Sequence, residues 1–241
     1  MNEAILRALA PYGELRAAIN MSNFLLVSGR SADDSPDGLS PDLAKEIATR
    51  LGVPCRLIPF EGPGQLADVV GQDIWDIGNI ALEPERAQTI DFSASYIKID
   101  ANFLVRENSD ITTNAEVNKQ GIEIILYNRS AYDLWLKENF SYPDYVRVPS
   151  IQESHKMFYD GKADVLASLK PRLVDELAKI AGYRIIEQPF TSIHQSVGIQ
   201  KGHPEALEFL NSLIADLSGN GFIERSLKRH GVEEKLSMTV F

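Results

Sequence analysis

The sequence predicts an α/β protein of two lobes, each with its own sheet, joined by two extended crossing segments. Three observations lead to this prediction. Short apolar runs alternate with amphipathic helical patterns, an order that favours parallel strands covered by helices. Two long extended segments, 90–105 and 193–202, interrupt this alternation. The length of 241 residues is enough for two small lobes that each bury a core.

The first series of elements begins with the apolar run 14–19, which predicts a strand. A helix is expected over 40–52, with Ser40 as its N-cap, Pro41 at its first helical position and Gly52 as its stop. The same reasoning gives the remaining elements of this series: strand 54–60, helix 64–70 and strand 75–82.

The second series follows the extended segment 90–105, which contains no helical pattern. Its expected elements are strand 122–128, helix 130–139, strand 144–149, helix 151–161, strand 163–169, helix 171–182 and strand 183–190. The second crossing and two helices, 204–221 and 222–231, then close the chain. The first lobe is therefore expected to comprise 1–98 and 195–241, with 99–194 inserted as the second lobe.

Composition and charge exclude several classes of function. The formal net charge is −10 and no run of Lys or Arg is present, so nucleic acid is not an expected partner. No apolar run reaches the roughly 20 residues of a membrane span, so no membrane insertion is expected. The first twenty residues lack the basic and apolar regions of a secretory leader, which leaves a cytoplasmic location open.

The patterns of cysteine, histidine and glycine give no sign of a metal or a cofactor. None of the four histidines has a second His or Cys at a metal-ligand spacing. The single cysteine, Cys55, lies in an apolar run and is expected to be a buried core residue. The chain has no nucleophile elbow, phosphate-binding lysine loop or dinucleotide-binding glycine loop. These absences favour binding over catalysis without excluding an enzyme.

Several segments, in this order along nearly the whole chain, resemble one protein family. They are "GELRAAIN", "GLSPDLAKEIATRLGV", "WDIGNIALEPERAQTIDFSASY", "NRSAYDLWL", "YDGKADVLASLK" and "HQSVGIQKGHPEALEFLN". The sequence resembles the bacterial extracellular solute-binding proteins of family 3, the amino-acid-binding type. The resemblance implies a periplasmic-binding-protein-like (type II) fold with a two-strand hinge, a ligand held in the interlobe cleft and closure on binding. It also implies a location in the periplasm and delivery of the ligand to the permease of an ABC importer. A monomer is the default expectation.

The motif "EPERAQTIDFS" contains the first candidate ligand residue, Arg86. The resemblance implies that this arginine grips the carboxylate of the ligand, and a guanidinium is suited to that role because it is planar, permanently charged and bidentate. The family has threonine where this chain has Glu83. Ala81, just upstream, is a further candidate. The alternative for Arg86 is a surface charge near a helix end.

The segment "NRSAYDLWL" provides a second group of candidates. Ser130 is expected to cap the helix that follows, so that the first backbone N–H groups of this helix form an anion site. Arg129 adds a positive charge and Asn128 a polar group just before the cap. The alternatives are a cap without a ligand and a solvated arginine.

Lys170 marks a departure from the family pattern. The resemblance implies an aspartate near this position, which would pair with the ammonium of an α-amino acid, and this chain has Leu169 and Lys170 instead. Either Glu83 takes over the ammonium, or the ligand has none. A surface lysine at a helix start is the alternative.

Three polar residues complete the candidates. Asn20 and Asn23 follow the first strand, where the family places cleft residues, and Asn23 could equally be a turn residue. Gln195 lies on the second crossing, from which it could reach the cleft or bond hinge backbone.

The candidate charges favour an acidic ligand. Arg86, Arg129 and Lys170 outnumber Glu83, so a cleft lined by all four would be positive and would suit a small anion or an acidic zwitterion. We expect a solute-binding protein without cofactor or metal that takes a small carboxylate-bearing ligand. The alternative is a dehydratase-like enzyme on the same scaffold, with Glu83 as general acid acting on a small cyclic carboxylate. A sensor lobe of a larger receptor is a third option.

Overall fold

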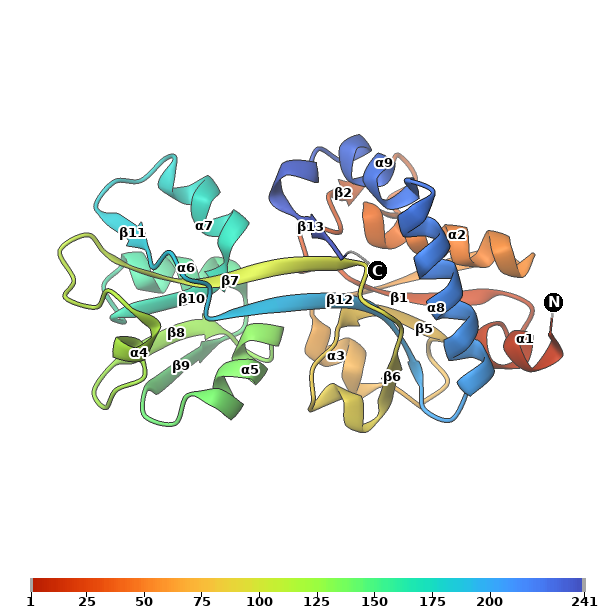
Figure 1. Ribbon diagram of the computed structural model, residues 1–241, viewed down its shortest axis with the longest axis horizontal. Helices are drawn as coiled ribbons and strands as arrows, with labels where there is room; N and C mark the ends of the chain where they lie inside the picture. The colour runs from red at the N-terminus through yellow and green to blue at the C-terminus, as the bar shows by residue number, and fades with distance from the viewer. Residues whose placement is uncertain (1, 240–241) are drawn as a thin grey trace. The chain divides into compact units, whose positions relative to one another are not determined.

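The computed structural model describes residues 2–239, which form two compact units (Figure 1). Unit 1 consists of Met1–Lys98 and His194–Phe241, and unit 2 consists of Ile99–Ile193. The chain passes from one unit into the other along two strands, β7 (Ile97–Arg106) and β12 (Thr191–Gln200).

Unit 1 contains strands in the order β4, β1, β5 and β12, with β6 paired to β12. Strands β4, β1 and β5 are mutually parallel, while β12 runs antiparallel to β5 and β6. Four of these five strands lie wholly in unit 1: β1 (Leu15–Asn20), β4 (Cys55–Phe60), β5 (Ile77–Ala81) and β6 (Ile90–Phe92). Its helices are α1 (Glu3–Leu9), α2 (Leu39–Leu51), α3 (Pro63–Asp68), α8 (Pro204–Gly219) and α9 (Phe222–Arg229).

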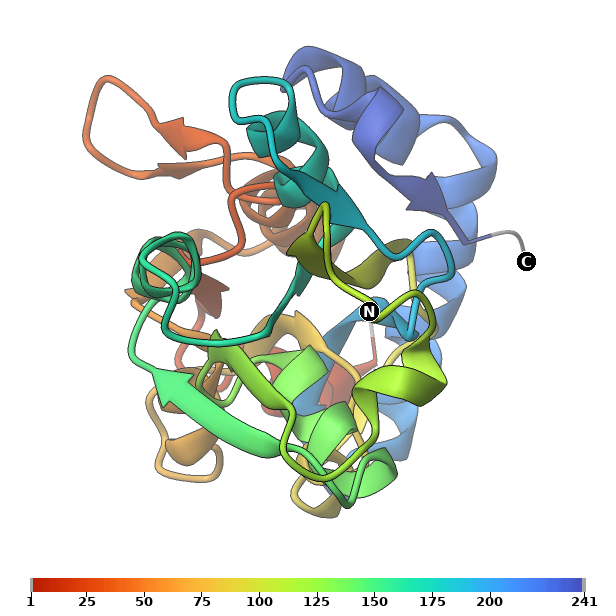
Figure 2. The ribbon, with the colours of Figure 1, turned by 90° about the vertical axis from the view of Figure 1, so that its left-hand side faces the viewer.

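Short elements connect these strands and helices. They are β2 (Gly29–Arg30), β3 (Pro36–Asp37), the 3₁₀ helices η1 (Arg86–Gln88) and η2 (Glu233–Lys235), and β13 (Ser237–Met238). Strands β2 and β3 form a hairpin whose loop projects outward and is exposed (Figure 2). Strand β13 pairs with the beginning of β7.

The start of α2 differs from the prediction. The N-cap is Gly38 rather than Ser40, and no side chain caps the helix. Leu26 passes so close that a Cβ on Gly38 would lie 2.4 Å from the Leu26 carbonyl oxygen, and the Ser40 N–H donates to this same oxygen at 3.0 Å. Backbone thus replaces the expected serine cap. The predicted end is confirmed, because Gly52 adopts the left-handed conformation there.

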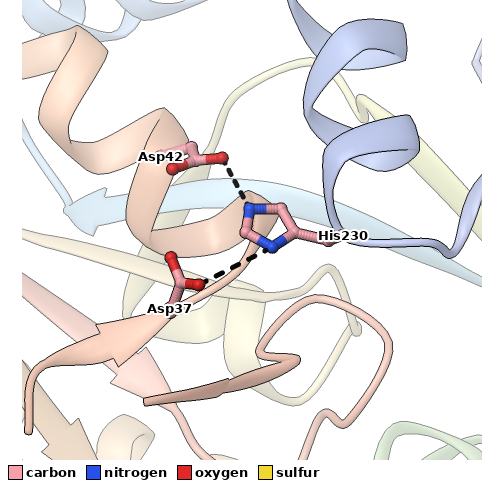
Figure 3. Close-up of side chains that lie close together, drawn as sticks. All are labelled: Asp37, Asp42 and His230. Carbon is pink, nitrogen blue, oxygen red and sulfur yellow. Dashed lines mark hydrogen bonds and ion pairs between the residues drawn. The ribbon is translucent and has the colours of Figure 1, made fainter. Parts of the chain in front are cut away.

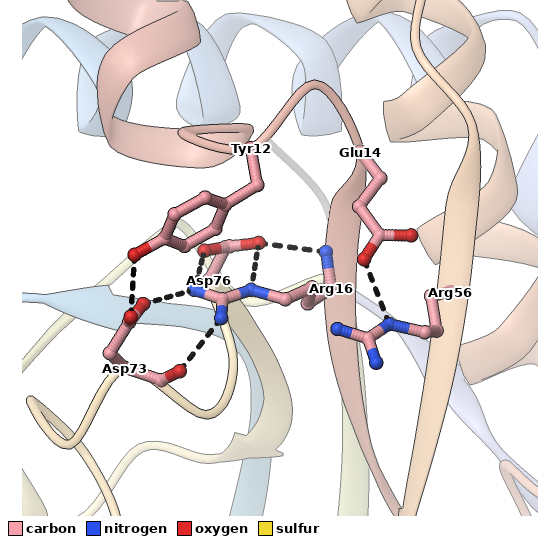
Figure 4. A network of polar contacts seen from close by, with 6 residues as sticks. All are labelled: Tyr12, Glu14, Arg16, Arg56, Asp73 and Asp76. Atoms are coloured by element: carbon pink, nitrogen blue, oxygen red, sulfur yellow. Dashed lines mark hydrogen bonds and ion pairs between the residues drawn. The ribbon is translucent and has the colours of Figure 1, made fainter.

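A buried arginine joins the amino ends of two neighbouring strands in unit 1 (Figure 4). Arg16, near the start of β1, donates through Nη2 and Nε to both carboxylate oxygens of Asp76 at 2.7 and 3.1 Å. The Arg16 N–H also donates to Asp76, and Asp76 precedes β5 directly. Hydrogen bonds from Tyr12 and Arg16 lower the pKa of Asp73. The core lies next to this network and contains Ala18, Leu66, Trp75, Ile80 and Ile90.

Unit 2 has strands in the order β11, β7, β10, β8 and β9. Strands β10, β8 and β9 are parallel, and β7 runs antiparallel to β10 and β11. The elements are α4 (Asn114–Val117), β8 (Glu123–Tyr127), α5 (Ala131–Asn139), β9 (Asp144–Val148), α6 (Ile151–Tyr159), β10 (Val165–Leu169), α7 (Lys170–Leu177) and β11 (Tyr183–Ile185). Leu104, Ile125, Phe158, Leu166 and Leu173 are buried together in a separate core.

Other details of the prediction need correction. Helix α1 was not expected, and 90–105 is not one continuous strand, because β6 ends at Phe92 and β7 begins at Ile97. Cys55 is half-buried rather than buried, because β4 is an edge strand. Burial still raises the pKa of its thiol to about 11. None of the helices within residues 2–239 combines the length and apolar character that a membrane-spanning helix needs.

Candidate functional site

The candidate residues of unit 1 lie mostly at the carboxyl edge of its parallel strands. Asn20 is the last residue of β1 and Ala81 the last of β5, so the two strands end at the same edge. Gln195 joins this edge because it pairs with Ala81 across the antiparallel β5–β12 ladder. Ligands of open α/β sheets bind outside the carboxyl ends of the strands, so this is the expected edge for recognition.

Arg86 is buried at this edge. It opens η1, is 5% exposed, and donates from Nη1 to the Ala81 carbonyl at 3.0 Å. Glu83, in the turn between β5 and η1, is also 5% exposed, and its carbonyl accepts from the Ala87 N–H. The sequence therefore places two oppositely charged, buried side chains within one turn. Burial of charged groups is costly, so such positions are seldom incidental.

The two asparagines after β1 have local partners. The Asn20 side-chain oxygen accepts from the Ser22 N–H and hydroxyl at 3.2 and 2.7 Å. The Asn23 side-chain oxygen accepts from the Leu25 N–H at 3.3 Å. Both amide oxygens therefore stabilise the turn after β1, which for Asn23 is the alternative role given above. A ligand contact from either residue stays a prediction.

In unit 2 a second group lies at the carboxyl end of β8. Ser130 is the N-cap of α5, as predicted, and its hydroxyl accepts from the Asp133 N–H at 3.1 Å. Arg129 has a φ of 58°, and its N–H donates to the Asp133 carboxylate at 2.7 Å. Asn128 is exposed and its N–H continues the ladder to Val148. The left-handed Arg129 thus turns the chain from β8 into α5.

Lys170 lies at the end of the neighbouring strand. It is the first residue of α7, directly after β10, and β10 is parallel to β8. Its side chain is half-buried. Arg147, on the other side of β8, donates from Nε to Asp133 at 2.8 Å. Each unit therefore assembles its own group of candidates at one edge of its sheet.

Asp133 was missed among the candidates, although the sequence contained a signal for it. Its carboxylate accepts from the Arg129 N–H and from Arg147, so it holds the turn that carries Asn128, Arg129 and Ser130. A Ser followed three residues later by an acidic residue before an apolar run is a helix-start pattern.

A second cluster in unit 1 joins Asp37, Asp42 and His230, whose ligand-type atoms lie within 4.8 Å of one another (Figure 3). His230 Nε2 lies 2.9 Å from the Asp42 carboxylate, while Nδ1 lies 3.0 Å from the Ser28 hydroxyl and 3.9 Å from the Asp37 carboxylate. Asp42 also accepts hydrogen bonds from Ser226 and Arg229. The geometry fits a polar cluster, with an ion pair between Arg229 and Asp42, that ties β3 and α2 to the end of α9.

Unit 2 contains a buried serine–histidine–glutamate arrangement. His155 Nε2 lies 2.9 Å from the Ser168 hydroxyl, and Nδ1 lies 2.5 Å from Glu176. Burial raises the pKa of Glu176, but hydrogen bonds from His155 and Tyr159 outweigh it and lower this pKa to about 2. The order of groups is that of a nucleophile, base and orienting acid. Ser168 is only 1% exposed, however, so a substrate cannot reach its hydroxyl in this structure.

Comparison with known proteins identifies the relatives of this chain. The family model for bacterial extracellular solute-binding proteins, family 3, matches residues 20–233. The L-cystine-binding protein TcyJ of Escherichia coli (strain K12) is 22% identical over 200 residues, which cover 80% of this chain and 73% of that protein.

Solved structures share the fold. A mutant of ArgBP from T. maritima has a TM-score of 0.75 at 20% identity, covering 95% of this chain and 99% of that one. The ancestral amino acid-binding protein AncCDT-1, a precursor of cyclohexadienyl dehydratase, has a TM-score of 0.74 at 22% identity, covering 93% and 98%. At these identities the likeness concerns the fold, which is that of the type II periplasmic binding proteins.

Proposed function

Since the chain belongs to the bacterial extracellular solute-binding proteins of family 3, we propose that it captures a small carboxylate-bearing ligand, either amino-acid-like or an organic acid. The ligand carboxylate would be held by Arg86 from unit 1 and by the start of α5 at Ser130 from unit 2. The two units would act as lobes that close through β7 and β12. The names of similar proteins, which mention L-cystine and, for a structure of ArgBP from T. maritima, bound arginine, support an amino-acid-like solute.

One observation carries this proposal: the position of Arg86. A guanidinium that is 5% exposed opens η1 at the carboxyl edge of the parallel strands, and its Nη1 is held by the Ala81 carbonyl. This hydrogen bond fixes the orientation of the planar group, which lowers the entropy cost of binding a carboxylate. Charge-assisted contacts of about 1.5–3 kcal/mol each make a micromolar affinity, about −8 kcal/mol, attainable after ordering costs.

The test is the affinity of Arg86 variants. A thermal-shift screen over amino acids, opines, keto acids and dicarboxylates identifies a ligand, and calorimetry then measures its dissociation constant. We expect Arg86→Ala to raise this constant at least tenfold, which is about 1.4 kcal/mol. Arg86→Lys keeps the charge and loses the bidentate fork, so its affinity should lie between those of Arg86→Ala and the unmodified protein.

Controls separate binding from folding. Arg7→Ala removes an exposed arginine of α1 outside the matched family region and should leave the affinity unchanged. Thermal unfolding without ligand reports whether the loss of a buried arginine weakens the fold itself. A folded Arg86→Ala protein with unchanged affinity would contradict the proposal.

Membership of this family also supports a proposal about the protein's cellular location and its transport partner. We propose that the protein works outside the cytoplasm, in the periplasm, and delivers its ligand to the permease of an ABC importer. The family description, which names extracellular solute-binding proteins, supports this. Co-purification with a permease from membranes that also contain the ligand would test the partner.

A second candidate function, a dehydratase-like activity, is favoured by one specific observation. Glu83 is an acidic side chain only 5% exposed in the turn that leads to Arg86, a setting that suits a general acid. AncCDT-1 is described as a binding protein that preceded an enzyme. If this candidate holds, cyclic acids of the prephenate type are turned over, and Glu83→Gln abolishes turnover while binding persists. Binding without turnover would reject it.

A further inference from the structure

The last strand of unit 1 pairs with the beginning of the first crossing strand. In the antiparallel ladder between β13 and β7, Ser237 lies opposite Lys98 and Met238 lies opposite Ile97. Lys98 is the last residue of unit 1 before the chain enters unit 2. The ladder therefore lies wholly within unit 1, at the point where the chain leaves this unit.

Further contacts hold the residues just before β7. The Thr239 N–H donates to the Tyr96 carbonyl at 3.3 Å, and the Tyr96 N–H donates to the Gln195 carbonyl of β12 at 3.0 Å. The Ser95 hydroxyl donates to the Ile97 carbonyl at 3.1 Å. A hydroxyl has one proton, so the Thr239 hydroxyl is the donor in its 3.2 Å contact with Ser95. The entry to β7 is thus bonded to β12 and to the segment around β13.

The segment that leads to β13 is fixed at its other end as well. It begins after α9, where Arg229 and His230 both contact the Asp42 carboxylate of α2. Val232 then anchors the segment in the core, because its side chain is only 8% exposed. Residues 231–239 therefore run between two places that are both held by unit 1, the end of α9 and the start of β7.

These bonds limit where the crossing strand can bend. A hinge consists of a few residues whose backbone angles change when domains move. A stretch that is bonded to neighbours on both sides can change its backbone angles only if hydrogen bonds break. The stretch from Ser95 to Lys98 is bonded in this way, so a change of angle in this crossing costs less beyond Lys98.

We propose that residues 231–239 act as a strap that fixes the unit 1 end of β7 and confines bending of this crossing to residues after Lys98. Release of the strap widens the range of arrangements that the two units adopt without ligand. The inference rests on the proposed function in one respect, the closure of the two units through β7 and β12.

The first experiment removes backbone donors from the strap by proline substitution. Antiparallel ladders alternate between pairs that exchange hydrogen bonds and pairs that do not. Because the Thr239 N–H donates to Tyr96, the pair Ser237–Lys98 is bonded and the pair Met238–Ile97 is not. A protein with both Ser237→Pro and Thr239→Pro loses two donors, whereas Met238→Pro, the matched control, loses an N–H that does not bond β7.

Hydrogen exchange followed by NMR reports the result at one amide. In a bonded pair the Lys98 N–H donates to the Ser237 carbonyl. We expect this amide to exchange on the order of tenfold faster in the double variant than in the unmodified protein, and Met238→Pro to cause little change. Thr239→Val removes only the hydroxyl contact with Ser95 and should give a smaller change in the same direction. It provides the test if the double variant does not fold.

The second experiment measures the arrangement of the two units without ligand. Spin labels are placed on cysteines introduced by Lys45→Cys in α2 and Lys119→Cys in unit 2, two exposed positions, and Cys55→Ser removes the native thiol. Pulsed electron paramagnetic resonance then gives the distribution of distances between the labels. We expect a broader distribution in the double proline variant than in Met238→Pro, whose distribution should match that of the protein without proline substitutions.

The outcomes separate the inference from the proposed function. Equal exchange of the Lys98 amide in the double variant and in Met238→Pro would show that the strap does not hold β7. Faster exchange with an unchanged distance distribution would show that the strap does not limit how the units move, and either result overturns the inference. Both measurements are made without ligand, so the affinity of the Arg86 variants tests the proposed function independently.

Discussion

At the scale of single residues, Gly38 determines how α2 begins. Its φ is 145° and ψ is −178°, and the Leu26 carbonyl lies where a Cβ would project. The same carbonyl accepts the Ser40 N–H, so the first turn of the helix is closed by a neighbouring segment of backbone. Glycine is needed because any side chain would push these two segments apart.

Replacing Gly38 with alanine should therefore destabilise the fold by about 1–3 kcal/mol, the usual cost of forcing atoms into a filled space. Chemical denaturation measures this as a change in the free energy of unfolding. Gly29→Ala is the matched control because a Cβ there meets nothing within 4 Å. Its effect should stay within about 0.5 kcal/mol. Equal stabilities of the two variants would contradict this interpretation of Gly38.

Residue-level predictions succeeded where the cause was local. Ser130 caps α5 because a serine before an apolar helix can bond its own helix, and Gly52 ends α2 for a similarly local reason. The prediction that Ser40 caps α2 was wrong. The Ser40 N–H is bonded by the Leu26 carbonyl, which comes from a neighbouring segment that local sequence patterns do not reveal. The binding roles of the candidate residues stay predictions.

At the scale of elements, Arg16 and Asp76 connect β1 to β5 at the ends opposite the candidate site (Figure 4). The guanidinium is nearly enclosed, and the Tyr12 ring stacks over it at 4.9 Å. Because the pair is buried, removing one partner leaves a charge without compensation, which is far more costly than loss of an exposed pair.

We expect Asp76→Ala to destabilise the fold by about 3 kcal/mol or more. Glu14→Ala is the control, because Glu14, directly before β1, and Arg56 of the neighbouring strand β4 form an ion pair at 2.9 Å that is much more exposed. Its cost should not exceed about 1 kcal/mol. Urea unfolding of the two variants gives both values. Similar small losses would show that the Arg16 network contributes little to stability.

The order of helices and strands was predictable because each element shows the spacing of apolar residues that is typical of its type. The helices α2, α5 and α6 and the strands β8 and β10 were expected from apolar spacing, and all five are present within about two residues at each end. The break between β6 and β7 was not expected, because residues 93–96 contain no Gly or Pro that would mark it. Its cause is tertiary: the Ser93 and Tyr96 N–H groups donate to β12 at Val197 and Gln195.

At the scale of the whole molecule, the fold class was predictable and is confirmed by solved structures that share the fold. The Asp37–Asp42–His230 cluster was not, because His230 is almost two hundred residues from the carboxylates and shares no motif with them. Contacts between residues so far apart in the sequence depend on how α9 packs near α2. The spacing of residues along the chain does not predict this packing. The candidate ligand residues became visible only through a family resemblance that spans both units.

The division of unit 1 into two stretches of sequence has a consequence for synthesis on the ribosome. Unit 2 is continuous, so all of its strands have emerged once residue 193 has left the exit tunnel. Unit 1 still lacks β12, α8 and α9 at that moment, and β5 has no partner on its β12 side. Unit 1, which begins the chain, is thus the last unit to be completed. Until β12 has been synthesised, the edge of its sheet at β5 is not covered.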